Sequence, residues 1–194
     1  MLKARIAVMV SGGGTNLQAL IDAQKAGKIS HGEIVLTVSS NREAYALERA
    51  AANGISTAVM ENEASLLNMM KSEKIDMIVL AGFLKILSKE FIEGFGKPII
   101  NIHPSLIPSF CGKGCYGLHV HEKALAYGVK VTGATVHYVN EIPDGGKIIL
   151  QKAVNIQDGD TPEILQKRVM QEAEWILLPQ AVELISEKIT KGEN

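Results

Sequence analysis

The strongest indication of the fold is the run Ile6-Ala7-Val8-Met9-Val10-Ser11-Gly12-Gly13-Gly14-Thr15-Asn16-Leu17. Its first five residues are all apolar, which is typical of a β-strand that is buried on both faces of a parallel sheet. Glycines follow directly, and the spacing of Leu17, Leu20 and Ile21 then predicts a helix. A strand, a glycine-rich turn and the start of a helix, in this order, indicate a unit of an α/β sheet.

The glycine-rich turn is also a candidate anion-binding site. The first turn of a helix presents backbone N–H groups without partners and a partial positive charge. Glycine lets a ligand approach the backbone closely, and the side chains of Thr15 and Asn16 can add hydrogen bonds. We therefore expect Gly13, Gly14, Thr15 and Asn16 to bind the phosphate group of a substrate. The turn is neither a GxGxxG fingerprint nor a P-loop with its lysine, and an ordinary turn between strand and helix is the alternative.

Apolar strands and amphipathic helices continue to alternate along the chain. Strands are expected at residues 34–38, 56–60, 75–80, 98–100, 131–139 and 147–154, and helices at residues 44–53, 61–72, 118–127 and 161–188. Strands that alternate with helices pair in parallel through right-handed crossovers. The sequence therefore predicts an α/β fold with a doubly wound, mostly parallel, Rossmann-like sheet. The last two strands could pair in antiparallel fashion, which would make the sheet mixed at one edge. Pro179 is expected to kink or divide the last helix.

A second informative run, Asn101-Ile102-His103-Pro104-Ser105, follows the apolar residues 98–100. Side chains two residues apart on an extended chain point to the same side, so the amide and the imidazole would lie together. They would do so at the carboxyl end of a strand, where open α/β sheets bind their ligands. An amide donor beside a titratable ring can stabilise an oxyanion and move a proton. In the alternative interpretation, both groups only satisfy backbone atoms at the end of a strand.

Composition argues against several classes of protein. The chain has 194 residues, with 20 Lys and Arg against 21 Asp and Glu. A near-neutral balance without a basic run argues against a protein that binds nucleic acid or a membrane surface. The first residues do not have the pattern of a signal peptide, and no apolar run approaches the ~20 residues of a membrane span. We therefore expect a cytoplasmic protein.

The chain has two cysteines, Cys111 and Cys115, and both fall in a long connection at residues 104–117. Two thiols supply only half of a structural zinc site, although His119 and His121 are close in the sequence. We expect free thiols and no bound metal. A connection of this length in a compact protein is usually functional and often acts as a lid.

Three motifs of the chain resemble those of the folate-dependent formyltransferases. Their first signature is similar to Asn101-Ile102-His103-Pro104-Ser105-Leu106-Ile107-Pro108, and their second to His137-Tyr138-Val139 followed by Asp144-Gly145-Gly146 and Ile149-Leu150-Gln151. The third motif matches residues 11–16, and the resemblance covers residues 5–185. It implies that the chain transfers a formyl group from the co-substrate 10-formyltetrahydrofolate to the amine of 5-phosphoribosylglycinamide in de novo purine biosynthesis.

The resemblance also implies an organisation for the whole chain. Residues 1–194 would form a single formyltransferase domain, with a Rossmann-like phosphate-binding half at residues 1–100 and a catalytic and folate-binding half at residues 101–194. Its partners would be small-molecule substrates rather than nucleic acid or a membrane. The protein would be a monomer or a homodimer.

The catalytic residues that the resemblance implies are Asn101, His103 and Asp144. Attack of the substrate amine on the formyl carbon would create an oxyanion, to which the Asn101 amide and a His103 N–H would donate hydrogen bonds. Asp144 would orient His103, directly or through water, and assist a proton relay. The transfer would be direct, without a covalent intermediate. On its own, Asp144 before Gly145-Gly146 is equally typical of a turn.

The resemblance assigns binding roles as well. Glu172 would contact the glycinamide end of the acceptor, and the folate would be bound by Phe83, Leu84, Lys85, Ile86, Leu87, Val139, Asn140 and Glu141. Lys85 stands where many members of the family have arginine, which weakens any bidentate contact with a carboxylate. Two other functions are the alternatives, a formyltetrahydrofolate hydrolase and a non-catalytic module that binds a sugar phosphate.

Overall fold

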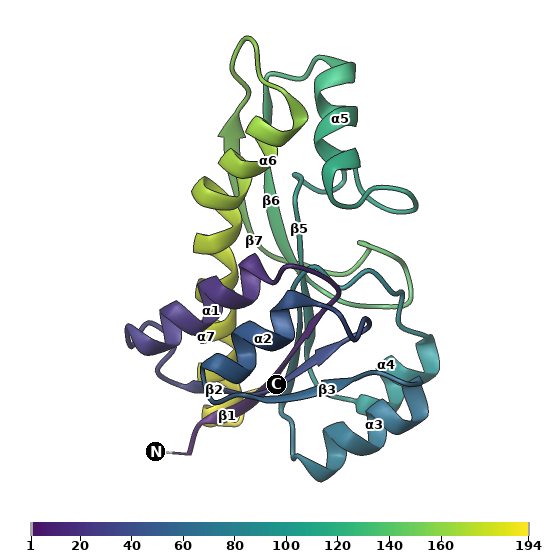
Figure 1. Ribbon diagram of the computed structural model, residues 1–194, viewed down its shortest axis with the longest axis vertical. Helices are drawn as coiled ribbons and strands as arrows, with labels where there is room; N and C mark the ends of the chain where they lie inside the picture. The colour runs from purple at the N-terminus through teal and green to yellow at the C-terminus, as the bar shows by residue number, and fades with distance from the viewer. Residues whose placement is uncertain (1, 194) are drawn as a thin grey trace.

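Seven strands form one mixed sheet at the centre of the computed structural model, which describes residues 2–193 (Figure 1). They are β1 (Ala4–Val10), β2 (Gly32–Ser39), β3 (Ser56–Val59), β4 (Met77–Leu80), β5 (Ile99–His103), β6 (Val131–Tyr138) and β7 (Ile148–Asn155). Their order across the sheet is β3-β2-β1-β4-β5-β6-β7. Neighbours from β3 to β5 are parallel, and β6 is antiparallel to both β5 and β7. The predicted doubly wound, mostly parallel α/β fold with a mixed edge is therefore confirmed.

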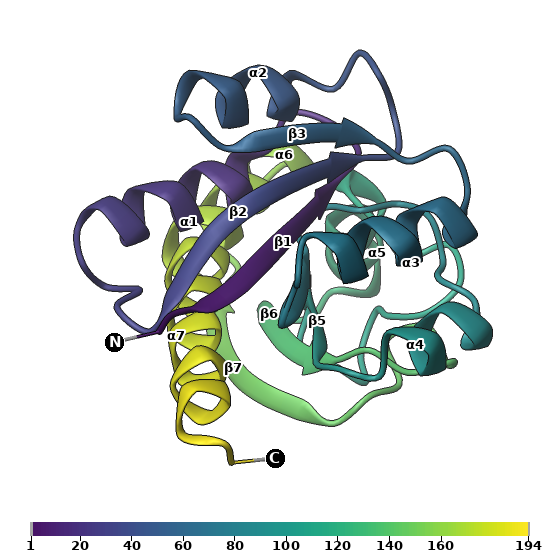
Figure 2. The ribbon, with the colours of Figure 1, turned by 90° about the horizontal axis from the view of Figure 1, so that it is seen from below.

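Helices cover both faces of the sheet (Figure 2). They are α1 (Thr15–Lys25), α2 (Tyr45–Ala52), α3 (Glu63–Ser72), α4 (Lys89–Phe95), α5 (Leu118–Tyr127), α6 (Pro162–Val169) and α7 (Trp175–Lys191), and the π-helical turn η1 (Met170–Glu174) joins the last two. Ile6 and Val8 of β1 pack with α1, α2, α6 and α7, whereas Ala7 and Met9 pack with α3 and α4 on the opposite face. Burial on both faces explains why β1 is apolar at every position. Within the described residues, no helix is long and apolar enough to cross a membrane.

Two helical regions differ from the sequence prediction. The helix α4 lies where the sequence predicts none, because its seven residues are too few to establish a periodicity. It begins after Ser88, whose Oγ accepts a hydrogen bond from the Phe91 N–H at 3.1 Å. The prediction that Pro179 divides the last helix is wrong: α7 continues through Pro179, and the irregular turn is η1, which precedes α7.

The strand β5 brings the second sequence motif to the carboxyl edge of the parallel strands. Asn101 and His103 lie two residues apart near its end, so both side chains point to the same side. The antiparallel register pairs Asn101 with His137 of β6 and His103 with Thr135. This register brings His137, which is distant in the sequence, directly beside Asn101.

Candidate active site

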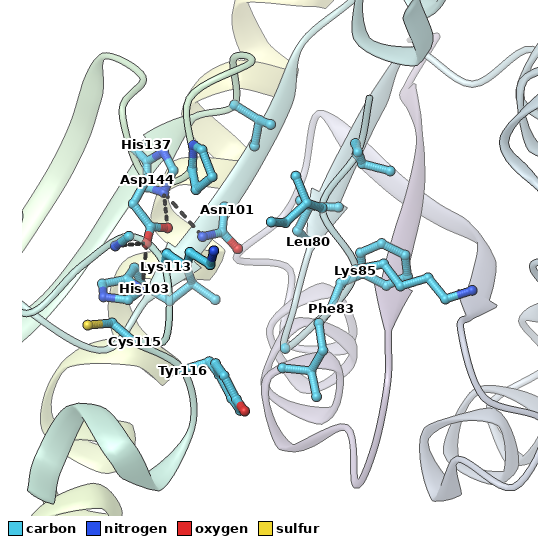
Figure 3. Close-up of a pocket in the computed structure, with 18 of the residues that line it drawn as sticks. Leu80, Phe83, Lys85, Asn101, His103, Lys113, Cys115, Tyr116, His137 and Asp144 are labelled. Atoms are coloured by element: carbon cyan, nitrogen blue, oxygen red, sulfur yellow. Dashed lines mark hydrogen bonds and ion pairs between the residues drawn. The ribbon is translucent and has the colours of Figure 1, made fainter. Parts of the chain in front are cut away.

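A cavity of about 490 Å³ opens at the carboxyl ends of β4 and β5 (Figure 3). Asn101, His103, His137 and Asp144 gather on one side of it, and the loop after β4 forms the opposite side. Residues 112–117 of the long connection also line the cavity. Its volume is in the range of small-molecule sites. Among the described residues, no group of three or more His, Cys, Asp or Glu side chains is arranged to hold a metal ion.

Asp144 lies between the two histidines of the cavity. Its Oδ2 is 3.6 Å from Nδ1 of His103, its Oδ1 is 3.6 Å from Nε2 of His137, and Oδ2 accepts the Gly112 N–H at 2.8 Å. Burial alone would raise the pKa of Asp144, but its contacts with His137, His103 and Gly112 outweigh burial, and the pKa is lowered. Asp144 is therefore an anion that faces the buried ring of His103.

The hydrogen bond of His103 determines which of its nitrogens can react. Its Nε2–H donates to the Phe110 carbonyl at 3.0 Å. Because a neutral imidazole has one N–H, the lone pair is then on Nδ1, which faces Asp144. Burial lowers the pKa of His103, and Asp144 opposes this by raising it. The neutral ring therefore offers a proton acceptor at Nδ1, and only the protonated ring offers Nδ1–H to an oxyanion.

Asn101 is oriented by His137, a contact that sequence reasoning did not identify. The Nδ1–H of His137 donates to the Tyr138 carbonyl at 2.8 Å, so in the neutral ring Nε2 is an acceptor. The Nδ2 of Asn101 donates to this Nε2 at 3.1 Å. An amide NH₂ has two hydrogens, so the second remains available to a ligand in the cavity.

The loop that holds Asp144 requires its two glycines. Asp144 has a φ of 57°, in the left-handed region, which Asp tolerates better than most residues. A Cβ at Gly146 would lie 1.7 Å from the Tyr138 carbonyl oxygen, and one at Gly145 would lie 2.7 Å from Cγ2 of Ile142. The turn expected from Asp144-Gly145-Gly146 is therefore real, and it is also what delivers the carboxylate to the end of β5.

The structure brings most of the predicted folate-binding residues to the cavity. The lining includes Phe83, Leu84, Lys85, Ile86, Leu87, Val139 and Asn140. Glu141 is exposed and is not among the lining residues. The side chains of Leu84 and Ile86 are apolar, yet these residues are 63% and 72% exposed. Exposed apolar side chains at the rim of a cavity are typical of a binding surface.

The glycine-rich turn has the geometry of an anion site. In the described part of the chain, no side chain caps the first turn of α1. Gly14 has a φ of 73°, and a Cβ there would lie 2.6 Å from that of Ala46, so packing requires glycine. A Cβ at Gly12 or Gly13 would meet nothing within 4 Å, which leaves their surface open to a ligand. Arg49 fixes the turn, since its Nε donates to the Gly13 carbonyl at 2.8 Å.

A family model described as formyl transferase matches residues 4–182 of the chain. The chain belongs to the formyl transferase family. Its fold agrees with this assignment. The solved structure of glycinamide ribonucleotide transformylase 1 from Symbiobacterium toebii is 38% identical and superposes with a TM-score of 0.88, covering 95% of this chain and 88% of that one.

Curated members of the formyl transferase family resemble the chain over nearly its whole length. Phosphoribosylglycinamide formyltransferase of Haemophilus influenzae is 38% identical, over 94% of this chain and 87% of the relative. The human trifunctional purine biosynthetic protein adenosine-3 is 41% identical over 99% of this chain, which spans only 19% of that protein.

In this member of the formyl transferase family, the acid nearest the glycine-rich turn is Glu174. Its Oε2 accepts a hydrogen bond from Nδ2 of Asn16 at 2.6 Å, and both residues are buried. Burial raises the pKa of Glu174 to about 7, although the hydrogen bond from Asn16 opposes the shift. Glu172 lies on the same turn η1 but is exposed, and its contact with substrate stays a prediction. Sequence reasoning missed Glu174 because its burial depends on the π-helical turn.

We expect Glu174→Gln to stabilise the protein at high pH. The folded state holds the proton of Glu174 up to about pH 7, whereas the unfolded chain releases it near 4.5. The free energy of unfolding therefore falls as pH rises through this window, by about 3 kcal/mol at most. Glutamine keeps an oxygen that accepts from Asn16 and has no charge to bury. Urea unfolding between about pH 5 and about pH 8 should show this gain developing with pH.

The matched control for this prediction is Glu172→Gln, which changes an exposed acid on the same turn. Its free energy of unfolding should follow that of the unmodified chain at every pH. A Glu174→Gln variant with the same pH dependence as the unmodified chain would show that Glu174 is already ionised below pH 7.

Proposed function

We propose that the chain transfers the formyl group of 10-formyltetrahydrofolate to the amine of 5-phosphoribosylglycinamide, a step of purine biosynthesis. The observation that carries this proposal is that Asn101, His103 and Asp144 meet in a cavity whose other wall is the apolar loop at residues 83–87. The acceptor is supported by relatives named phosphoribosylglycinamide formyltransferase. In this organisation, residues 1–100 bind the phosphate and residues 101–194 supply the catalytic groups and part of the folate site.

His103 accepts the proton of the attacking amine. Its Nδ1 has the free lone pair in the neutral ring, and Asp144 is 3.6 Å away. As the amine nitrogen bonds to the formyl carbon, the proton passes to Nδ1, directly or through water. The resulting imidazolium is stabilised by the Asp144 carboxylate, which the Gly112 N–H holds in place.

Asn101 and the protonated His103 stabilise the tetrahedral oxyanion. The second hydrogen of the Asn101 amide points away from His137 and donates to the oxyanion. The bond between the formyl carbon and N10 of the folate then breaks, and Nδ1–H of His103 returns its proton to N10. The product amide and tetrahydrofolate leave with no group attached to the chain.

The two substrates approach this centre from different sides. The folate ring binds against residues 83–87 and 139–140, and the phosphate of the acceptor binds at Gly13, Gly14, Thr15 and Asn16. The two regions are linked, because the Leu84 N–H donates to Oγ of Ser11 at 2.9 Å. The amine end of the acceptor contacts an acid of η1, for which Glu172 is the sequence prediction and Glu174 is the acid beside Asn16.

The proposal is tested by following the absorbance of a 10-formylfolate donor with and without 5-phosphoribosylglycinamide. We expect donor to be consumed only when the amine is present, with formylated acceptor as the product. Donor consumption without the amine, with release of formate, would indicate a hydrolase. Binding of the sugar phosphate without any consumption would indicate a non-catalytic module.

A further inference from the structure

The two cysteines flank the backbone group that holds Asp144. Gly112, which donates its N–H to Oδ2 of Asp144 at 2.8 Å, directly follows Cys111. The Cys115 N–H donates to the Gly112 carbonyl at 3.0 Å, which closes a turn over residues 112–115. A turn of this kind brings its first and fourth Cα atoms within about 7 Å. The cysteines are therefore brought together around the donor to Asp144.

Both thiols are free and partly exposed, but their surroundings differ. Cys111 donates to the Pro108 carbonyl at 3.2 Å, and its pKa is raised by burial first, then by Asp144 and by Cys115. The influence of Cys115 on Cys111 places the two sulfur atoms close together. Cys115 lines the cavity, and the Nζ of Lys123 is 3.1 Å from its Sγ. An ammonium at this distance attracts the thiolate, which is the nucleophile in thiol–disulfide exchange.

We propose that Cys111 and Cys115 form a redox-active dithiol, and that its oxidation by a low-molecular-weight disulfide removes the Gly112 hydrogen bond from Asp144 and lowers turnover. The reaction is a two-step exchange. The Cys115 thiolate attacks the oxidant RSSR, forming Cys115–S–S–R and releasing RS⁻. Cys111 then attacks Sγ of Cys115, the bond to R breaks, and a second RS⁻ leaves. The two thiol protons end on the two RSH molecules, and the oxidant has taken up two electrons.

Closure of the disulfide changes the contacts that hold the turn. The Sγ of Cys111 must leave the Pro108 carbonyl, and that of Cys115 must leave Lys123. The peptide N–H next to Cys111 is that of Gly112, so rotation at Cys111 turns this donor away from Asp144. Asp144 then loses one of the contacts that lower its pKa and orient it toward His103. Reduction restores the original arrangement.

The experiment exposes the purified chain to excess oxidised glutathione, labels the remaining free thiols with an alkylating reagent and measures the intact mass and the turnover. We expect the reduced chain to take two labels and the oxidised chain none, with no glutathione retained. Turnover should fall about tenfold or more, as when a charged group loses a hydrogen bond, and dithiothreitol should restore it. Saturation with the folate donor should slow the oxidation, because Cys115 lines the cavity.

Two variants complete the test. Cys111→Ser keeps a donor for the Pro108 carbonyl and should retain glutathione on Cys115 as a stable mixed disulfide. The double variant Cys111→Ser/Cys115→Ser should have the same turnover with and without oxidant. Failure of the unmodified chain to form the internal disulfide, or its formation with unchanged turnover, would overturn the proposal. The label count is independent of the proposed function: a reduced chain without turnover would refute that function and leave the dithiol measurable.

Discussion

Asp144→Asn is expected to lower kcat at least about 10³-fold while both substrates still bind. Asparagine is nearly the same size, so the turn at residues 144–146 and the Gly112 hydrogen bond to the side-chain oxygen can persist. The negative charge that stabilises the imidazolium of His103 is lost. Because this charge matters only when His103 is protonated, the effect falls on the reaction rather than on binding. Steady-state kinetics, together with the Kd of each substrate from calorimetry, separate the two.

Asp158→Asn is a suitable control. Asp158 is fully exposed and pairs with Lys130 only at 4.0 Å, so its replacement should leave kcat unchanged. If Asp144→Asn weakens substrate binding as much as it lowers kcat/KM, Asp144 positions the substrate and does not assist proton transfer.

His103→Ala should lower kcat by about 10²- to 10⁴-fold, because it removes the group proposed to accept and return the proton. The ring is only 4% exposed, so the substitution also leaves a cavity in the protein. A thermal unfolding measurement shows whether the variant remains folded, and His103→Gln provides a polar replacement closer in volume. The partly exposed His31, which is paired with Glu183 on the far side of α7, provides a control in His31→Gln.

The pH dependence distinguishes a base from a purely structural histidine. Burial lowers the pKa of His103 below 6.5, and Asp144 raises it in part. The reactive form is neutral, so kcat/KM should rise with pH through a limb below 6.5 and then level off. Asp144→Asn removes the contact that raises this pKa, so its limb should lie at lower pH. An unchanged acid limb in His103→Ala or His103→Gln would assign the titration to another group.

The local patterns of the sequence were sufficient for the fold class. The run at residues 6–10 is apolar because β1 is buried by helices on both faces, and that requirement is visible in any strand at the centre of a sheet. The glycines at residues 12–14 and the spacing of Asn101 and His103 on β5 are equally local. The role of Asp144 depended on the resemblance to a family, since Asp144-Gly145-Gly146 alone predicts only a turn.

What the sequence could not determine depends on contacts between distant residues. His137 orients Asn101 because the antiparallel register of β5 and β6 places them opposite each other, and a register cannot be read from either strand alone. Glu174 rather than Glu172 faces Asn16 because the π-helical turn η1 adds a residue to the helical repeat. Periodicity within one helix cannot reveal such an insertion, since it is stabilised by packing of α7 against α1. The sequence by itself therefore determined the α/β fold and the residue types of the site, whereas only the tertiary structure decided which side chains meet.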